Sequence, residues 1–230
     1  VNPEVVYIDY IYVSTSSLGL TEHFREYADL VIKKICPVKG SLVIDIGSND
    51  GILLKFFKAK GMNVLGIEPA KVIAQKATES GIKTLPSFFD FNLANKIKSE
   101  YGSASIITAN NLFANVDNLL DLTKGIKSLL SPDGVFIFES FYLVDQIKNM
   151  VFDFTYHEHL SYFSVKPLES FFKSLGMELI DAKRDPSKGG SLRYTVQLDN
   201  GPRSVSASIS ELKLEEEKLG IHNGKAFESY

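Results

Sequence analysis

Two stretches of this 230-residue sequence gather side chains that can do chemistry. The first is the glycine-rich and acidic loop 45–51, and the second is Tyr156-His157-Glu158-His159. Histidine has an ordinary pKa near neutrality, so the second stretch is suited to moving protons. Glycines let a loop approach a ligand closely, so the first stretch is suited to binding one.

The spacing of the loop argues against a dinucleotide. Gly47-x-x-x-Gly51 is not G-x-G-x-x-G, because Asn49 stands at the second glycine position and Asp50 would repel a phosphate. Acids in this loop favour a ligand with positive charge near its ribose, such as S-adenosylmethionine. Glu68 lies about 20 residues after Asp45, where an acid holds ribose hydroxyls in such folds. The alternative is that the glycines only let a strand turn into a helix.

Metal binding is the first rival reading of the two histidines. His157 and His159 can chelate from a loop, but a third ligand is missing, and the single cysteine, Cys36, excludes a site of several thiolates. We therefore expect no metal. A second rival is that both rings are hydrogen-bonded inside an aromatic loop.

Alternating strands and helices must position these residues. Short β-branched runs predict seven strands, and helical periodicity separates most of them. The strands are expected at 42–46, 63–68, 82–85, 105–109, 135–140, 178–183 and 192–198. This predicts an α/β fold with a Rossmann-like, doubly wound, mostly parallel sheet, whose last two strands form an antiparallel edge. Ligands then lie beyond the carboxyl ends of the strands.

Composition limits the partners. Lys+Arg number 25 and Asp+Glu 28, a net charge of −3, which argues against nucleic acid as a partner. No apolar run approaches the ~20 residues of a membrane span, and the N-terminus lacks a signal pattern. We expect a cytoplasmic protein with a small-molecule substrate and no membrane association.

Three motifs resemble those of class I S-adenosylmethionine-dependent methyltransferases. Residues 43–51 resemble the first motif of that family, residues 67–69 resemble the second, and residues 110–114 resemble the segment at the end of its fourth strand. The resemblance implies that S-adenosylmethionine or S-adenosylhomocysteine is bound. The residues implied are Asp45, Gly47, Ser48, Asn49, Asp50, Gly51, Glu68, Pro69, Asn110, Asn111 and Leu112.

A second resemblance covers about residues 10–226. The stretch 156–162 is similar to the hallmark of the deoxysugar C-methyltransferases, which act on nucleotide-linked 3-keto sugars. Carbon becomes nucleophilic there only after a base removes the proton next to a carbonyl. Our hypothesis makes His159 the base, with Glu158 and Tyr156 orienting the sugar or donating to the enolate oxygen. Substrate binding is assigned to Tyr12, His157, Lys188 and Arg193, the last two facing the diphosphate of a nucleotide-diphosphate sugar.

Departures from that family shape the expected domains. The family's cysteine-rich zinc-binding domain is absent from this sequence, and Asn115 stands where the family often has histidine. We expect an arm and helix in 1–36, the methyltransferase domain in 37–200, and the start of a truncated C-terminal lobe in 201–230. Two alternatives stay open. One is an O- or N-methyltransferase acting on another small molecule, and the other is a cofactor-binding module that is inactive as a fragment.

Overall fold

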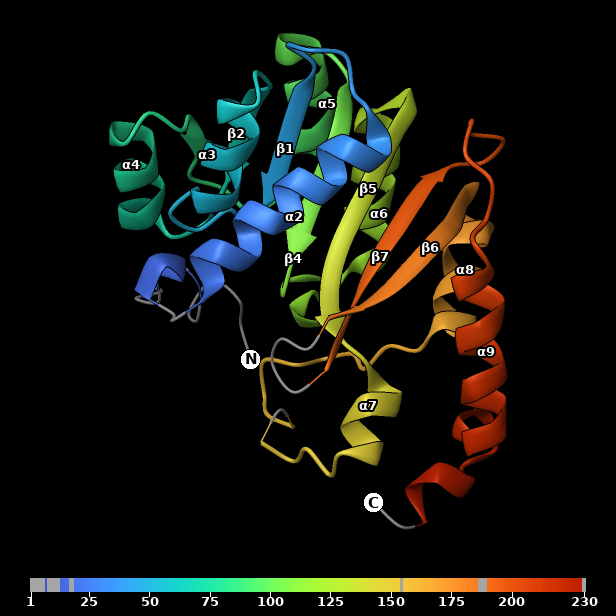
Figure 1. Cartoon of the computed structure of the whole chain (residues 1–230). Helices are drawn as coiled ribbons and strands as arrows, with labels where there is room; N and C mark the ends of the chain where they lie inside the picture. The colour runs from blue at the N-terminus through green and yellow to red at the C-terminus, as the bar shows by residue number, and fades with distance from the viewer. Residues whose placement is uncertain (1–6, 8–12, 17–18, 154, 186–189, 229–230) are drawn as a thin grey trace. The chain divides into compact units, whose positions relative to one another are not determined.

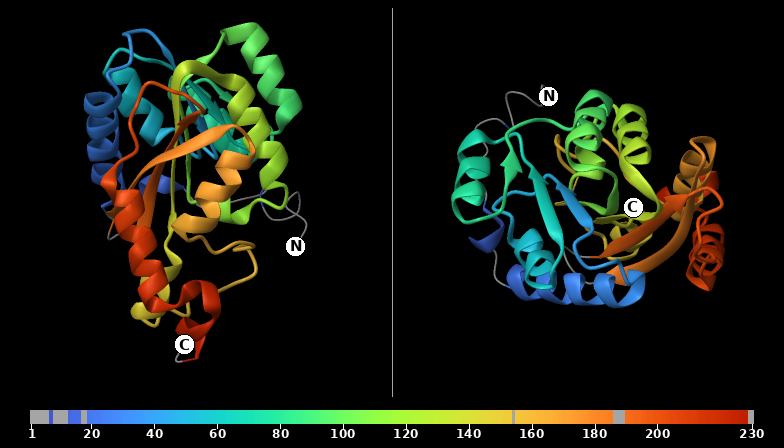
Figure 2. Two further views of the ribbon diagram at one scale, coloured as in Figure 1. Left: turned by 90° about the vertical axis from the view of Figure 1, so that its right-hand side faces the viewer. Right: turned by 90° about the horizontal axis from the view of Figure 1, so that it is seen from above.

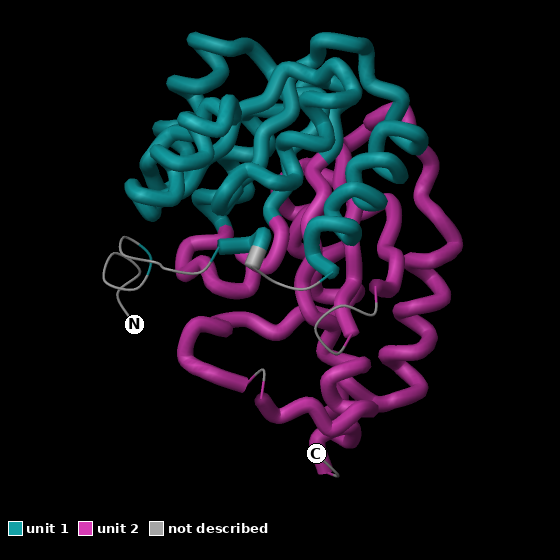
Figure 3. The backbone as a smooth tube through the Cα atoms, turned by 60° about the vertical axis from the view of Figure 1, so that its left-hand side comes forward, with its two compact units in different colours: residues 1–109, 120–135 teal, residues 110–119, 136–230 magenta. Residues whose placement is uncertain are grey.

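The computed structural model describes residues 7, 13–16, 19–153, 155–185 and 190–228. Tyr12 and Lys188, both predicted to bind substrate, lie outside the described residues. The chain forms two compact units, drawn in two colours in Figure 3. The first comprises Val1–Ala109 and Leu120–Val135, and the second Asn110–Leu119 and Phe136–Tyr230. The boundaries between the two compact units therefore lie near the end of the fourth strand and inside the fifth. The domain boundaries predicted from the sequence, at residues 36 and 200, stay a prediction.

The first unit is built on parallel strands. β1 (Leu42–Ile46) pairs with β2 (Asn63–Ile67) and β4 (Ala104–Asn110), and β2 pairs with the short β3 (Thr84–Leu85). α2 (Leu20–Ile35) and α3 (Ile52–Ala59) cover one face, and α5 (Phe91–Tyr101) and α6 (Leu119–Leu129) the other (Figures 1 and 2). α4 (Lys71–Glu79) packs beside β3, and η1 (Ser14–Ser16) precedes α2. All five residues of β1 are buried, as expected for a strand covered on both faces.

The second unit carries the antiparallel strands. β6 (Met177–Asp185) and β7 (Ser191–Leu198) form an antiparallel pair, and β5 (Leu130–Phe141) begins in the first unit and ends in the second. α8 (Val165–Ser174) and α9 (Ala207–Leu219) pack on β6 and on each other, while α7 (Leu143–Lys148) follows β5. Among the residues that the structure describes, this unit also has short 3-10 helices at η2 (Phe113–Asn115), η4 (Ile221–Asn223) and η5 (Lys225–Phe227).

Aromatic rings make up the core of the second unit. The ring centroids of Phe113 and Phe138 are 4.6 Å apart, and those of Phe138 and Tyr194 are 4.7 Å apart. Phe136 and Phe172 also lie within 6.4 Å of members of this group, and all five side chains are fully buried. Rings of this size contribute much of the apolar area that a domain buries, so this cluster holds β5, β7, α8 and η2 together.

The strand order is β3-β2-β1-β4-β5-β7-β6 in one seven-stranded sheet. This confirms the predicted fold class, including the antiparallel pair at one edge. α7 lies in a stretch where the sequence lacks clear periodicity and no helix is predicted. No helix of the described residues is long and apolar enough to cross a membrane.

Candidate active site

The loop after β1 needs its glycines for backbone reasons. Gly47 and Gly51 have φ values of 73° and 75°, in the left-handed region, and Asn49 between them has φ 49°. A Cβ on Gly51 would lie 2.9 Å from Ile82, so both conformation and space exclude a larger residue. The amides of Gly47 and Ser48 both donate to the carbonyl of Ile67 at the end of β2, at 2.8 and 3.1 Å. The loop is therefore fixed to the strand end that carries Glu68.

Glu68 is buried and bonded to backbone amides. One carboxylate oxygen accepts from the amide of Asn49 at 3.0 Å, and the other from that of Ala70, just after Pro69, at 2.9 Å. Burial raises the pKa of Glu68, and these two hydrogen bonds partly oppose the rise. Each oxygen keeps a second lone pair, so the carboxylate can still accept from ribose hydroxyls.

Asp45 is a deeply buried acid near the end of β1. Its side chain accepts a hydrogen bond from the Thr108 hydroxyl at 2.6 Å, and the residue is 5% exposed. Its pKa is raised to about 7: burial is the main cause, the Thr108 hydrogen bond opposes the rise, and the charge of Glu68 adds to it. A nearby cation would favour the ionised form, so this pair of acids suits a positively charged ligand.

The N-terminal segment touches the same loop. The amide of Ser14 donates to the Asn49 side chain at 2.8 Å, and that of Thr15 donates to Asp50 at 3.0 Å. The sequence analysis missed these two contacts, and no side-chain pattern could have shown them because both donors are backbone amides. The Ser48 hydroxyl lies over Gly66 of β2, where a Cβ would come within 2.5 Å of it. Its position therefore serves close packing between loop and strand.

In the second unit, two asparagines join the end of β4 to β5. The Asn110 side-chain oxygen accepts from the amide of Glu139 at 3.1 Å, and the Asn111 amide donates to the Glu139 carbonyl at 2.8 Å. The Asn110 side-chain nitrogen is buried and has no hydrogen-bond partner among the described residues. A buried donor without a partner is costly, so this nitrogen fits a ligand that offers an acceptor. Leu112 follows, half-buried, at the start of η2.

His159 sits among three aromatic rings in the second unit. Ring centroids lie 4.1 Å away for Tyr156, 4.3 Å for Phe141 and 6.4 Å for Tyr162. The His159 amide donates to the Tyr156 carbonyl at 3.0 Å, and the next two amides donate to the Ala114 carbonyl. We call the three rings around His159, those of Phe141, Tyr156 and Tyr162, the His159 cage. The sequence analysis picked Tyr156 but missed Phe141, the last residue of β5.

The other members of the hallmark are more open. Tyr156 is 42% exposed, and its pKa is raised first by partial burial and then by the charges of Glu158 and Tyr162. The phenol therefore stays protonated near neutrality and can donate a hydrogen bond. His157 is exposed and Glu158 half-buried. The structure thus brings Tyr156 and His159 into ring contact, with Glu158 close enough to act on Tyr156 electrostatically.

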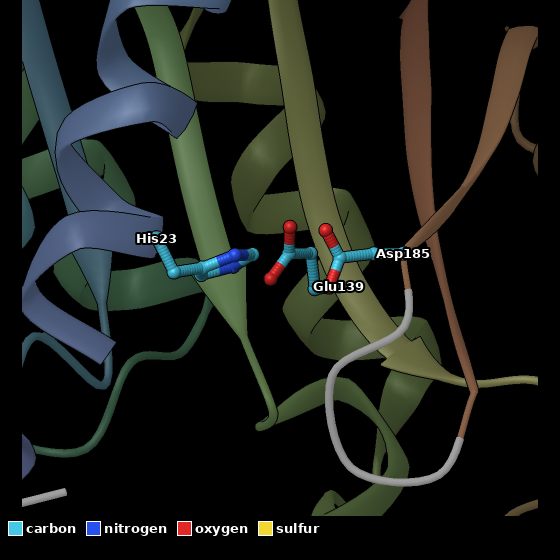
Figure 4. A group of neighbouring side chains, drawn as sticks. All are labelled: His23, Glu139 and Asp185. Carbon is cyan, nitrogen blue, oxygen red and sulfur yellow. The ribbon is translucent and has the colours of Figure 1, made fainter. Parts of the chain in front are cut away.

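Arg193 is held by a buried acid. Its guanidinium lies 2.5 Å from a carboxylate oxygen of Glu139 on β5 and 4.0 Å from Asp185 at the end of β6; Figure 4 labels both acids. The Arg193 side chain is 12% exposed and that of Glu139 is 2% exposed. A diphosphate at Arg193 would have to compete with Glu139. The sequence analysis missed both acids, which are 54 and 8 residues away along the chain.

A family described as "Methyltransferase domain" matches residues 20–182, more than half of the chain. The chain belongs to the methyltransferase family. This methyltransferase domain is 32% identical over 221 residues to the C-methyltransferase NovU of Streptomyces niveus, covering 96% of the chain. That match covers 53% of NovU, so the chain spans about half the length of this relative.

Solved structures share the fold at low identity. The magnesium protoporphyrin IX methyltransferase of Synechocystis PCC 6803, with bound S-adenosylhomocysteine, aligns with a TM-score of 0.58 at 12% identity, over 78% of this chain and 83% of that one. A protein of Pyrococcus horikoshii OT3 aligns with a TM-score of 0.64 at 14% identity, over 82% and 95%. These findings confirm the predicted membership in the class I S-adenosylmethionine-dependent methyltransferases.

Proposed function

We propose that this methyltransferase domain transfers a methyl group to the carbon beside the ketone of a nucleotide-linked keto sugar. The observation that carries the proposal is His159 in its cage, in a chain similar to a C-methyltransferase. Methyl transfer to carbon needs a base that removes the α-proton, whereas O- or N-methylation often proceeds by proximity alone. A positioned base contributes about 10²–10⁴-fold to the rate.

In this proposal the acids of the first unit hold the methyl donor. S-adenosylmethionine, when bound, supplies a methyl group on a positively charged sulfur. Asp45 and Glu68 provide the negative charge that such a ligand favours, and the loop 47–51 provides a fixed backbone. The side-chain nitrogen of Asn110, in the second unit, has no hydrogen-bond partner among the described residues and is a donor that a bound ligand can use.

The second unit would handle the proton. His159 takes the proton from the α-carbon. The electron pair of the broken carbon–hydrogen bond then forms an enolate on the sugar. Tyr156, whose phenol is protonated near neutrality, donates a hydrogen bond to the enolate oxygen. The carbon then forms its bond to the methyl group as the bond from that methyl to sulfur breaks. Glu158 orients these groups, and His157, Arg193, Tyr12 and Lys188 bind the rest of the sugar nucleotide.

Solvent-deuterium exchange at the sugar α-carbon tests this proposal. We expect His159→Asn to lower both exchange and turnover by about 10²–10⁴-fold while calorimetry still detects S-adenosylhomocysteine. His157→Asn makes the same change at an exposed neighbour assigned to substrate binding, so it should raise the KM for the sugar and retain exchange at saturating sugar. Wild-type turnover without enolate exchange would favour the O- or N-methyltransferase. Cofactor binding without binding of a thymidine-diphosphate sugar would favour the inactive module.

A further inference from the structure

We propose that Glu216, on the helix α9, is a positioning residue that sets the geometry of the His159 cage. The inference rests on the proposed function, because it gives the cage its role in proton abstraction. It also gives a role to a charged helix that the sequence analysis assigned to the start of another lobe. All residues in the argument belong to the second unit.

Glu216 is a fully buried acid with hydrogen bonds to two other elements. The residue is 0% exposed. One oxygen accepts from the Tyr142 hydroxyl at 2.9 Å and from the Val165 amide at 2.5 Å, and the other accepts from the Lys166 amide at 3.2 Å. His222 lies 3.3 Å from that second oxygen. A carboxylate is the side chain that can accept on both oxygens at once.

These partners stand at the two ends of one segment. The stretch between Tyr142 and Val165 contains the hallmark, and Tyr142 forms a parallel bridge with Phe163 where the segment closes. The Leu143 amide donates to the Phe163 carbonyl at 3.1 Å in the same closure. Glu216 therefore bonds to Tyr142 on one side of the closure and to Val165 and Lys166 on the other. Phe141, which contacts the His159 ring, is the residue before Tyr142.

The chemistry of the acid predicts what its amide would do. Glutamine has one accepting oxygen, so Glu216→Gln leaves either the Lys166 amide or the pair of Tyr142 and Val165 facing an NH₂ donor. The first turn of α8 would also lose a negative charge that stabilises a helix N-terminus. We expect Tyr142 to shift and Phe141 to shift with it, which displaces His159 from its rings.

Glu217→Gln is the matched control for Glu216→Gln. It makes the same chemical change one residue along, at a side chain that is 54% exposed and pairs only loosely with Lys166, at 3.4 Å. The readouts are turnover, the affinity for S-adenosylhomocysteine, and the proton resonance of the His159 ring. The neighbouring rings shift that resonance. The resonance that disappears in His159→Asn belongs to His159. The resonance that disappears in His222→Gln belongs to His222, which keeps the two apart.

We expect Glu216→Gln to lower kcat by about ten- to a hundredfold and to move the His159 resonance, with cofactor affinity unchanged. A folded Glu216→Gln protein with an unmoved His159 resonance and kcat within about twofold of wild type would overturn the proposal. If that variant does not fold, Tyr142→Phe, which removes one donor to Glu216, takes its place. A moved His159 resonance with a lowered kcat would support the proposal, and an unmoved resonance with kcat within about twofold of wild type would overturn it. The resonance needs no turnover, so it tests Glu216 even if wild-type protein shows no α-carbon exchange.

Discussion

At the scale of single residues, burial and hydrogen bonding set the chemistry of the acids. Asp45 lies on β1 and Glu68 directly follows the neighbouring strand β2, and burial raises the pKa of both. Arg193 is instead paired with Glu139, at 2.5 Å. The acids of the first unit are therefore costly to ionise until a cation is present, whereas the acid beside Arg193 already has its counter-charge.

The raised pKa of Asp45 predicts a pH dependence of stability. The folded state holds the proton up to about pH 7, while the unfolded chain releases it near pH 3.8. Since the folded form binds more protons in this window, the free energy of unfolding falls as pH rises through it, by a few kcal/mol. Urea unfolding at several pH values measures this. Asp45→Asn should remove this part of the slope; an unchanged slope would contradict the prediction.

At the scale of elements, distant side chains set where helices begin and how loops are held. The helix α8 begins at Val165, where the Glu216 side chain accepts hydrogen bonds from the Val165 and Lys166 amides. The loop after β1 follows a different rule. Its left-handed glycines and the carbonyl of Ile67 fix it locally. One element thus depends on tertiary capping and the other on its own backbone.

Gly51→Ala tests the loop at this scale. The substitution combines a left-handed φ with a contact of 2.9 Å to Ile82, so we expect a loss of about 2–3 kcal/mol in the free energy of unfolding. Gly19→Ala is the control. Gly19 has a similar φ of 82° but nothing within 4 Å of a Cβ, so its cost should be limited to the backbone, about 1 kcal/mol. Equal losses in urea unfolding would argue that Ile82 does not restrict the loop.

At the scale of the whole molecule, the candidate residues divide between the two units. The loop, Asp45 and Glu68 belong to the first unit, and the His159 cage and the Arg193 pair to the second. Cofactor binding and proton abstraction should therefore respond to different substitutions. This separation gives each half of the proposed reaction its own measurement.

Thermal unfolding with S-adenosylhomocysteine checks that separation. A ligand at 100 times its Kd stabilises the folded state by about 2.7 kcal/mol, which raises Tm. We expect His159→Asn to keep the wild-type shift in Tm, because His159 is assigned to proton abstraction and not to cofactor binding. Glu68→Gln should reduce the shift, since an amide lacks the charge and one acceptor. A loss of the shift in His159→Asn would show that the two functions are not separable.

The sequence by itself determined the seven strands, the alternation of most of them with helices, and the position of the loop after β1. It could do so because β-branched runs, helical periodicity and glycine positions are local signals. Tertiary structure alone decided three pairings: Glu216 with Tyr142, Arg193 with Glu139, and Asn49 with Ser14, which are 74, 54 and 35 residues apart. No local pattern encodes such pairs, because the partner of a buried polar group is whichever group the fold brings to it.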